Sequence, residues 1–180
     1  MTIDIRLAAA SELSDIARIV VDVWRLTFAG LLPDEFLESM SYSHQEQRHR
    51  RYFGRAGVSY YVADDEGDSI VGFASGGLTR HASFPHEGEV YALYLLPAHQ
   101  RRRIGASLFH KVAVDLEEAG CRGLVAFALD NNPNRDFYAR LGGRQAIAEP
   151  IVLGSMTVGQ VAYLWDDIPA LTRDFHRFTE

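Results

Sequence analysis

Cysteine is almost absent from this 180-residue chain, and so are long apolar segments. A single cysteine, Cys121, excludes an internal disulfide framework and a metal site built from several cysteines. No apolar run approaches the roughly 20 residues that a membrane-spanning helix needs. The first 15 residues, MTIDIRLAAASELSD, are acidic and lack the apolar core of a secretory signal. We therefore expect a cytoplasmic protein that does not span a membrane.

Positive charge is also in deficit, because 18 Lys and Arg residues face 24 Asp and Glu residues and give a formal net charge of −6. A chain with this balance is repelled by nucleic acid and by anionic lipid, so binding to either is not expected. The seven histidines show no H-x-x-x-H spacing and accompany no carboxylate cluster. No metal site is predicted on this basis.

Hydrophobic periodicity predicts the order of helices and strands. Helical patterns cover residues 12–29, 33–40, 44–53, 104–119 and 134–143. Strand patterns cover residues 3–8, 59–65, 69–78, 88–96, 123–129, 145–153 and 160–165. This order predicts one α/β domain over residues 1–180, with helices flanking a mixed, mostly antiparallel sheet of six to seven strands. No further element is predicted in the charged tail.

Three consecutive arginines stand out against the acidic background. They lie in the stretch HQRRRIGASLFHKV, between the strand at 88–96 and the helix that begins near Ile104. The first N–H groups of a helix have no partner inside it, and the helix dipole adds positive charge there. Gly105 lets an anion approach the backbone, and arginine side chains suit phosphate oxygens. The stretch predicts a pocket for a phosphorylated ligand, formed by Arg101, Arg102, Arg103, Ile104, Gly105 and Ala106. A solvated basic helix start is the alternative.

Spacing excludes two common nucleotide sites, since the chain has neither the G-x-x-x-x-G-K-[ST] of a P-loop nor a G-x-G-x-x-G after its first strand. Instead, a strand ending in LYLLP, then Gln100, Gly105-Ala106 and an amphipathic helix resemble motif A of the GNAT acyltransferase superfamily, over residues 88–120. DNNPNRDFYARLGG resembles the second signature of that family, within residues 124–143. The resemblance implies the GNAT fold, with its strands splayed after the fourth.

One position departs from the family pattern Q/R-x-x-G-x-G/A. Arg103 stands where the pattern has its first glycine. We expect Arg103 to adopt right-handed helical backbone angles, which any residue tolerates, and so to keep its N–H in the loop.

The resemblance implies an N-acetyltransferase that uses acetyl-CoA as cosubstrate and acetylates a primary amine of a small molecule or peptide, by direct attack in a ternary complex. The backbone near Leu93 and Leu95 would pair with the pantetheine arm, and residues 101–106 would hold the pyrophosphate. Either Asn131 or Asn132 would contact the pantetheine or nearby backbone. The alternative is a non-catalytic acyl-CoA-binding or sensor domain of the same fold. The oligomeric state stays open, a homodimer included.

Tyr138 lies where the family places its general acid. A phenol with a reference pKa of about 10 is protonated at neutral pH and can donate a proton to the departing thiolate. The alternative is a core tyrosine whose hydroxyl bonds to the backbone. The acceptor amine cannot be identified, although the acidic balance favours a cationic one such as a polyamine, an aminoglycoside or a peptide amine.

Glu89 is the predicted base, acting through a water molecule. It opens the strand at 88–96, and the two-residue period of a strand predicts that it shares a face with Tyr91, Leu93 and Leu95. Members of the family often carry a glutamate near this place. Glu87 and bulk water compete for the same role.

Overall fold

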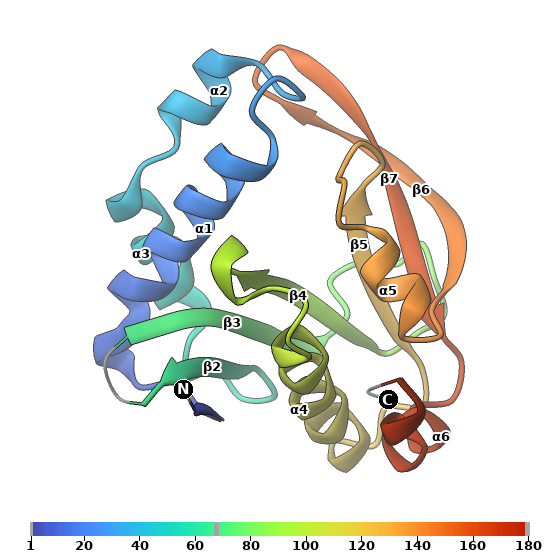
Figure 1. Cartoon of the computed structure of the whole chain (residues 1–180). Coiled ribbons are helices and arrows are strands. Elements are labelled where there is room, and N and C mark those ends of the chain that lie inside the picture. The colour runs from blue at the N-terminus through green and yellow to red at the C-terminus, as the bar shows by residue number, and fades with distance from the viewer. Residues whose placement is uncertain (1, 67–68, 179–180) are drawn as a thin grey trace.

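The computed structural model describes residues 2–66 and 69–178. Its strands are β1 (Ile3–Leu7), β2 (Ser59–Asp65), β3 (Ser69–Leu78), β4 (Gly88–Leu95), β5 (Leu124–Leu129), β6 (Arg144–Leu153) and β7 (Met156–Trp165). Its α-helices are α1 (Leu13–Thr27), α2 (Asp34–Ser39), α3 (Tyr42–Tyr52), α4 (Ile104–Glu118), α5 (Asp136–Arg140) and α6 (Ile168–Arg173). The predicted order of elements is confirmed through β7 (Figure 1).

The seven strands form one sheet in the order β1-β2-β3-β4-β5-β7-β6. Every neighbouring pair is antiparallel except β4 and β5, which run parallel. A parallel pair needs a crossover, and α4 supplies it. The predicted mixed, mostly antiparallel α/β sheet is therefore confirmed.

Helices cover both faces of the sheet, because each presents one apolar stripe to it. The face under α4 carries the largest apolar cluster, which includes Phe109 and Val112 of α4 and Leu124 and Ala126 of β5. The opposite face, under α1, carries a second cluster of buried residues: Leu13, Ile16, Ile19, Val20, Val23, Tyr60, Val62 and Phe73. The two clusters hold the half of the sheet from β1 to β4 between α4 and α1 (Figure 1).

Two parts of the C-terminal region differ from the prediction. Strand β7 begins at Met156 rather than at residue 160, because residues from Ile151 to Leu153 of β6 continue the antiparallel pairing toward the hairpin turn. The charged tail contains α6, whose first turn is capped by Asp167: its carboxylate accepts the backbone N–H of Ala170 at 3.0 Å. Ile168 and Leu171 of α6 are buried against the cluster under α4.

The parallel pairing of β4 with β5 is short, and this creates the feature on which the site depends. It covers three residue pairs, which are Gly88 with Leu124, Glu89 with Val125 and Val90 with Ala126. Beyond Val90, β4 stays paired with β3, while β5 stays paired with β7. The backbones of the two strands diverge beyond this point (Figure 1), and we call the unpaired stretch between β4 and β5 the opening. The predicted splay after the fourth strand is confirmed.

The segment between α1 and α2 lies across the far end of this opening. Phe28 and Leu32 pack with Leu129 at the end of β5 and Val158 of β7 in a third apolar cluster. The chain therefore connects the two halves of the sheet at the bottom through the β4–β5 pairs and at the top through this cluster (Figure 1).

Candidate active site

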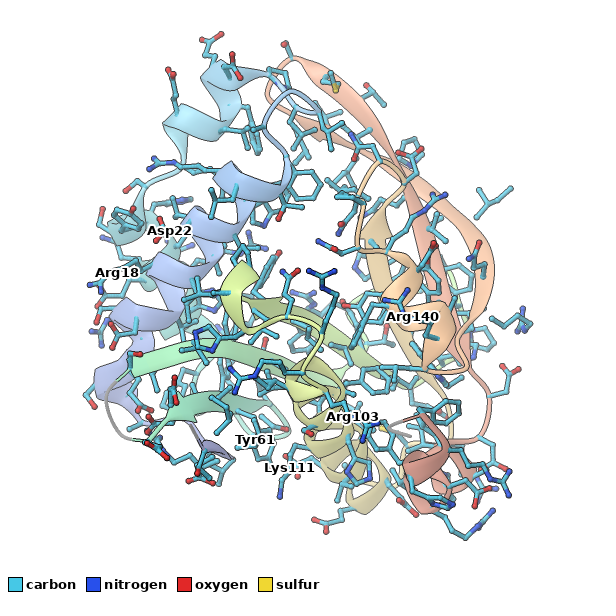
Figure 2. The ribbon with its side chains drawn as sticks, in the orientation of Figure 1. Arg18, Asp22, Tyr61, Arg103, Lys111 and Arg140 are labelled. Carbon is cyan, nitrogen blue, oxygen red and sulfur yellow. The ribbon has the colours of Figure 1, made fainter. Side chains whose placement is uncertain are left out.

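The loop that leads into α4 is tied to the end of β4. The side-chain Nε2 of Gln100 donates a hydrogen bond to the carbonyl oxygen of Leu95 at 3.1 Å. Arg101, Arg102 and Arg103 follow, and all three are exposed. Figure 2 labels Arg103 at the first turn of α4. The three positive charges and the splayed end of β4 therefore lie next to each other.

Arg103 does not adopt the right-handed angles expected from the sequence. Its φ is 65° and its ψ is 0°, so it occupies the left-handed region, and Arg101 does the same with a φ of 60°. The tight turn from Gln100 into α4 needs this conformation, which is the reason why a glycine fits here. The expectation of right-handed angles for Arg103 was wrong. The backbone follows the left-handed path that suits glycine, and the Cβ of Arg103 makes this conformation strained.

The N-terminus of α4 has no side-chain cap. The first helical hydrogen bond runs from the N–H of Ser107 to the carbonyl oxygen of Arg103 at 3.0 Å, so the N–H groups of Ile104, Gly105 and Ala106 have no acceptor within the helix. A β-carbon placed on Gly105 would lie 3.4 Å from Phe137 and 3.7 Å from Leu93. Gly105 thus packs against Phe137 of α5 and Leu93 of β4, and a side chain larger than alanine would crowd them.

The two asparagines after β5 are engaged differently. The Oδ1 of Asn132 accepts the backbone N–H of Asn134 at 2.8 Å and so stabilises the turn before α5. Asn131 reaches across the top of the opening, where its Nδ2 donates to the carbonyl oxygen of Leu31 at 3.3 Å. The Oδ1 of Asn131 is buried and has no partner among the described residues. The side-chain oxygen of Asn131 is therefore an unused acceptor, whereas that of Asn132 is used in the turn.

Tyr138 lies on α5 with its ring among other aromatic rings, at centroid distances of 5.3 Å from Tyr163 and 5.2 Å from Phe137. Burial raises the pKa of the Tyr138 phenol well above its usual range, and Tyr94 and Tyr163 add to the shift. No hydrogen bond from this hydroxyl is found within residues 2–66 and 69–178. The phenol is therefore protonated at neutral pH and has a donor to offer.

Strand β4 contains a bulge that changes which residues share a face. Its pairing with β3 shifts between Gly76 opposite Val90 and Ser75 opposite Ala92, so Tyr91 is an extra residue. Val90, Leu93 and Leu95 all belong to the cluster under α4, whereas Ala92 and Tyr94 pack in the cluster under α1.

Glu89 therefore does not share a face with Leu93 and Leu95, and that part of the prediction was wrong. The bulge reverses the alternation at Tyr91, because one inserted residue moves every later side chain to the other face. Glu89 lies on the face opposite α4, with its side chain only 2% exposed. The loop with the three arginines and the predicted base are thus placed on opposite faces of β4.

Two donors from the loop before β4 contact the Glu89 carboxylate. The Nη2 of Arg80 lies 2.6 Å from Oε1, and the backbone N–H of Arg80 donates to Oε2 at 2.8 Å. The Nε2 of His81 is 3.7 Å from Oε1. Arg80 also stacks on the ring of Tyr91 at 4.0 Å from its centroid. Sequence reasoning missed Arg80 and His81, because no periodic signal locates residues of an irregular loop.

Glu87, the competing candidate for the base, has a structural task. Its carboxylate accepts the backbone N–H groups of Gly123 at 3.0 Å and of Arg122 at 3.2 Å, and these bonds lower the pKa of Glu87. It fixes the loop before β5 to the start of β4 and lies away from the bulge.

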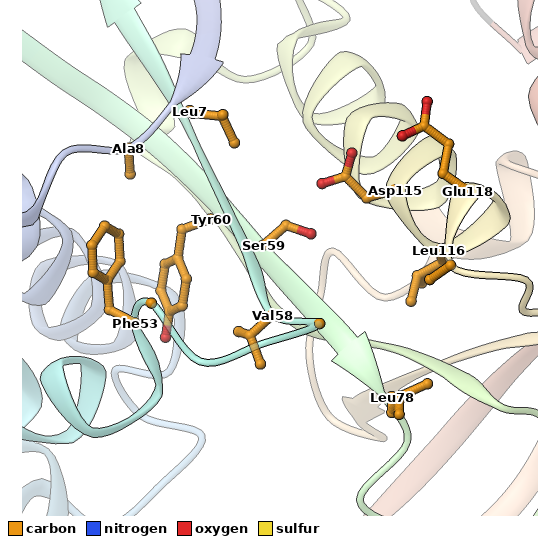
Figure 3. A pocket seen from close by; sticks show the side chains of 13 residues that line it. Leu7, Ala8, Phe53, Val58, Ser59, Tyr60, Leu78, Asp115, Leu116 and Glu118 are labelled. Carbon is orange, nitrogen blue, oxygen red and sulfur yellow. The ribbon is translucent and has the colours of Figure 1, made fainter.

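A cavity lies away from these residues. It measures about 520 Å³ and lies at the start of β2 and the C-terminus of α4 (Figure 3). Asp115 and Glu118 line one side, and Phe53 and Tyr60 line another. Its carboxylates and the negative end of the α4 dipole are unsuited to phosphate. No group of His, Cys, Asp and Glu residues in the described part of the chain is placed to hold a metal ion.

The left-handed strain at Arg103 leads to a stability prediction. Arg103→Gly should raise the free energy of unfolding by up to about 1 kcal/mol, because glycine adopts this conformation without strain, although the freedom of its unfolded chain offsets part of the gain. Urea denaturation of the wild type and the variant measures the difference.

Arg102→Gly is the matched control, because Arg102 is not among the residues with positive φ. That variant should lose roughly 0.4–1 kcal/mol through the added freedom of its unfolded chain. An equal loss in both variants would contradict the strain at Arg103.

No helix within residues 2–66 and 69–178 is both long and apolar enough to cross a membrane.

Comparison with known proteins agrees with this geometry. A solved PaiA N-acetyltransferase from Thermoplasma acidophilum in complex with coenzyme A is 18% identical, with a TM-score of 0.67 over 89% of this chain and 98% of the other. YncA from Salmonella typhimurium, solved with its cofactor acetyl-CoA, is 17% identical, with a TM-score of 0.67 over 92% and 94% of the two chains. These two structures share the fold.

Two further comparisons concern the sequence itself. The uncharacterized N-acetyltransferase YuaI of Bacillus subtilis strain 168 is 30% identical over 169 residues, which is 94% of this chain and 96% of the relative. The model of the Acetyltransferase (GNAT) family matches residues 24–143, which include both motifs. The chain belongs to the GNAT family of acetyltransferases.

Proposed function

We propose that this chain is an N-acetyltransferase that moves an acetyl group from acetyl-CoA to a primary amine by direct attack in a ternary complex. The observation that carries the proposal is the opening between β4 and β5 beside the uncapped, arginine-rich N-terminus of α4. The first feature offers an unpaired strand edge, and the second offers an anion site next to it. A phosphorylated pantetheine chain needs both, one for its amide groups and one for its phosphates.

The residues present fit that ligand. Residues Arg101 to Ala106 would hold the pyrophosphate with three exposed guanidinium groups and free helical N–H groups. The edge of β4 near Leu93 and Leu95, which no strand covers on the β5 side, would pair with the pantetheine arm. Asn131 is favoured over Asn132 as the polar contact, because its buried Oδ1 has no partner among the described residues.

Acetyl-CoA, when bound, supplies a thioester whose carbonyl carbon bonds to the amine nitrogen while the carbon–sulfur bond breaks. Glu89 would accept the proton that the amine nitrogen loses, through a water molecule. Its burial on the face opposite the loop 100–103 supports this role, since acceptor and cofactor then approach the bulge from different sides. Glu87 is disfavoured as the base because its carboxylate ties the loop before β5 to the start of β4, away from the bulge.

Tyr138 would donate its hydroxyl proton toward the sulfur of the leaving group. A thiol has a reference pKa of about 8.5, whereas burial raises the pKa of the Tyr138 phenol above its usual value, so complete proton transfer is uphill. The hydroxyl would act chiefly as a hydrogen-bond donor that stabilises the developing negative charge.

Binding measurements test the cofactor half of the proposal. Calorimetry should show that CoA binds at least about 100-fold more tightly than pantetheine without phosphates, because charge-assisted hydrogen bonds contribute roughly 1.5–3 kcal/mol each. Gly105→Val should weaken CoA binding at least about tenfold, because its methyl groups crowd the approach to the backbone N–H groups at 104–106, and such overpacking typically costs about 1–3 kcal/mol.

Gly105→Ala is the control, because its β-carbon meets Phe137 and Leu93 at ordinary contact distances and alanine favours a helix. It should fold at least as well as the wild type. Equal affinity for CoA and pantetheine would contradict the proposal that residues 101–106 bind the pyrophosphate. Normal CoA binding by the valine variant would contradict it as well.

The role of Tyr138 is tested by Tyr138→Phe, which removes only the hydroxyl and keeps the ring packing. Turnover should fall by about 100-fold or less, the lower end of what a general acid contributes, because a thiolate leaves readily. Melting temperature and CoA affinity should stay unchanged. Wild-type turnover, or a parallel fall in turnover and melting temperature, would make Tyr138 a structural residue.

A further inference from the structure

The buried carboxylate of Glu89 is closed off by Arg80. Glu89 is 2% exposed in its side chain, whereas the Arg80 side chain is 36% exposed and lies on it at 2.6 Å. The stacking of Arg80 on Tyr91 and the bond from its own backbone N–H to Glu89 fix the guanidinium in this place. Any acceptor that reaches Glu89 from solvent meets the guanidinium of Arg80 first.

The guanidinium has donors left over. Its Nη2 donates to Glu89, while no hydrogen bond from its Nε or Nη1 is found within the described ranges, 2–66 and 69–178. A guanidinium presents its N–H groups as a planar fork that matches a carboxylate with two parallel bonds. Arg80 therefore offers an anion site directly beside a buried carboxylate.

Other groups near Arg80 are also cationic or able to become so. His81 is half exposed and lies 3.7 Å from Glu89. On α3, the positive charge of Arg48 acts against the effect of burial, which raises the pKa of Tyr60 and Tyr94 on this face. A simple cationic amine would meet positive charge before it met Glu89, so the local charge points away from the cationic acceptor that the overall composition favours.

We propose that the acceptor is an amine with a carboxylate beside it, an α-amino acid or a close relative, whose carboxylate binds Arg80 while its amine faces Glu89. The assignment rests on the proposed acetyltransferase function and deepens it. Arg80 and Glu89 lie in contact, as the carboxylate and the amine of an α-amino acid do, so each group of the ligand meets the opposite charge. Arg80 is then a specificity-determining residue.

The test compares matched acceptors on one enzyme preparation with acetyl-CoA. Amino acids are taken across all side chains, each with its primary amide and its decarboxylated amine; methionine, methioninamide and 3-(methylthio)propylamine form one such set. The wild type should prefer the best amino acid over its two partners at least about tenfold in kcat/KM, because both partners lack the carboxylate. Since the ratio is taken within one preparation, the fraction of folded enzyme cancels.

Arg80→Gln should reduce this preference to about one, and Arg80→Lys should leave an intermediate ratio, because lysine keeps the charge but not the fork. The control is Arg18→Gln on the outer side of α1 (Figure 2), where Arg18 is 63% exposed, and it should keep the wild-type ratio. Affinity of each variant for CoA and its melting temperature are measured beside the ratio and should report an intact cofactor site.

Wild-type enzyme that acetylates amides or simple amines as well as amino acids would overturn the substrate assignment and leave the acetyltransferase function standing. An unchanged ratio in both Arg80 variants would overturn the role of Arg80 as a specificity-determining residue and would leave the acetyltransferase function standing. If the wild type acetylates none of the three classes, the substrate assignment fails, and amine-dependent thiol release with polyamines, aminoglycosides and peptide amines then decides the acetyltransferase function separately. If Arg80→Gln does not fold, the wild-type ratio still tests the substrate assignment, and the ratio of the lysine variant still tests the role of Arg80.

Discussion

The structure depends on the short parallel pairing of β4 and β5. Three residue pairs hold the two halves of the sheet together, and beyond Val90 each strand stays bound only to its outer neighbour. Backbone groups at the edge of a strand need hydrogen-bond partners, so two strands that diverge inside a sheet leave places for a ligand to pair. The cluster of Phe28, Leu32, Leu129 and Val158 packs across the far end of the opening and connects the two halves of the sheet there.

The bulge at Tyr91 gives this opening two different sides. Without it, Glu89 would project to the same face as Leu93 and Leu95, under α4, where the arginine loop begins. With it, the carboxylate lies on the opposite face, in contact with Arg80. In the proposed function, cofactor and acceptor would therefore reach one point on β4 from different sides, as direct transfer in a ternary complex requires.

The parts of the fold that follow from apolar periodicity could be predicted from the sequence. The helix at 104–118 and the apolar strand at 124–129 are examples, because burial on one face leaves a repeating pattern. The position of the three arginines between β4 and α4 was also predicted, whereas their binding of a phosphorylated ligand stays a prediction. Other features depend on the tertiary structure. The face of Glu89 turns on a single inserted residue, and the left-handed angle of Arg103 is imposed by the turn from β4 into α4. The contact of Arg80 with Glu89 arises from the path of an irregular loop, for which a sequence pattern offers no period.

The central claim is that acetyl transfer to an amine takes place at this opening, and release of free CoA thiol from acetyl-CoA across a panel of amines tests it most directly. The account predicts thiol release that depends on the amine, with one N-acetylated product found by mass spectrometry for each CoA released. Tight CoA binding with no amine-dependent thiol release would contradict it and would assign the chain to the non-catalytic binding or sensor domains of the same fold.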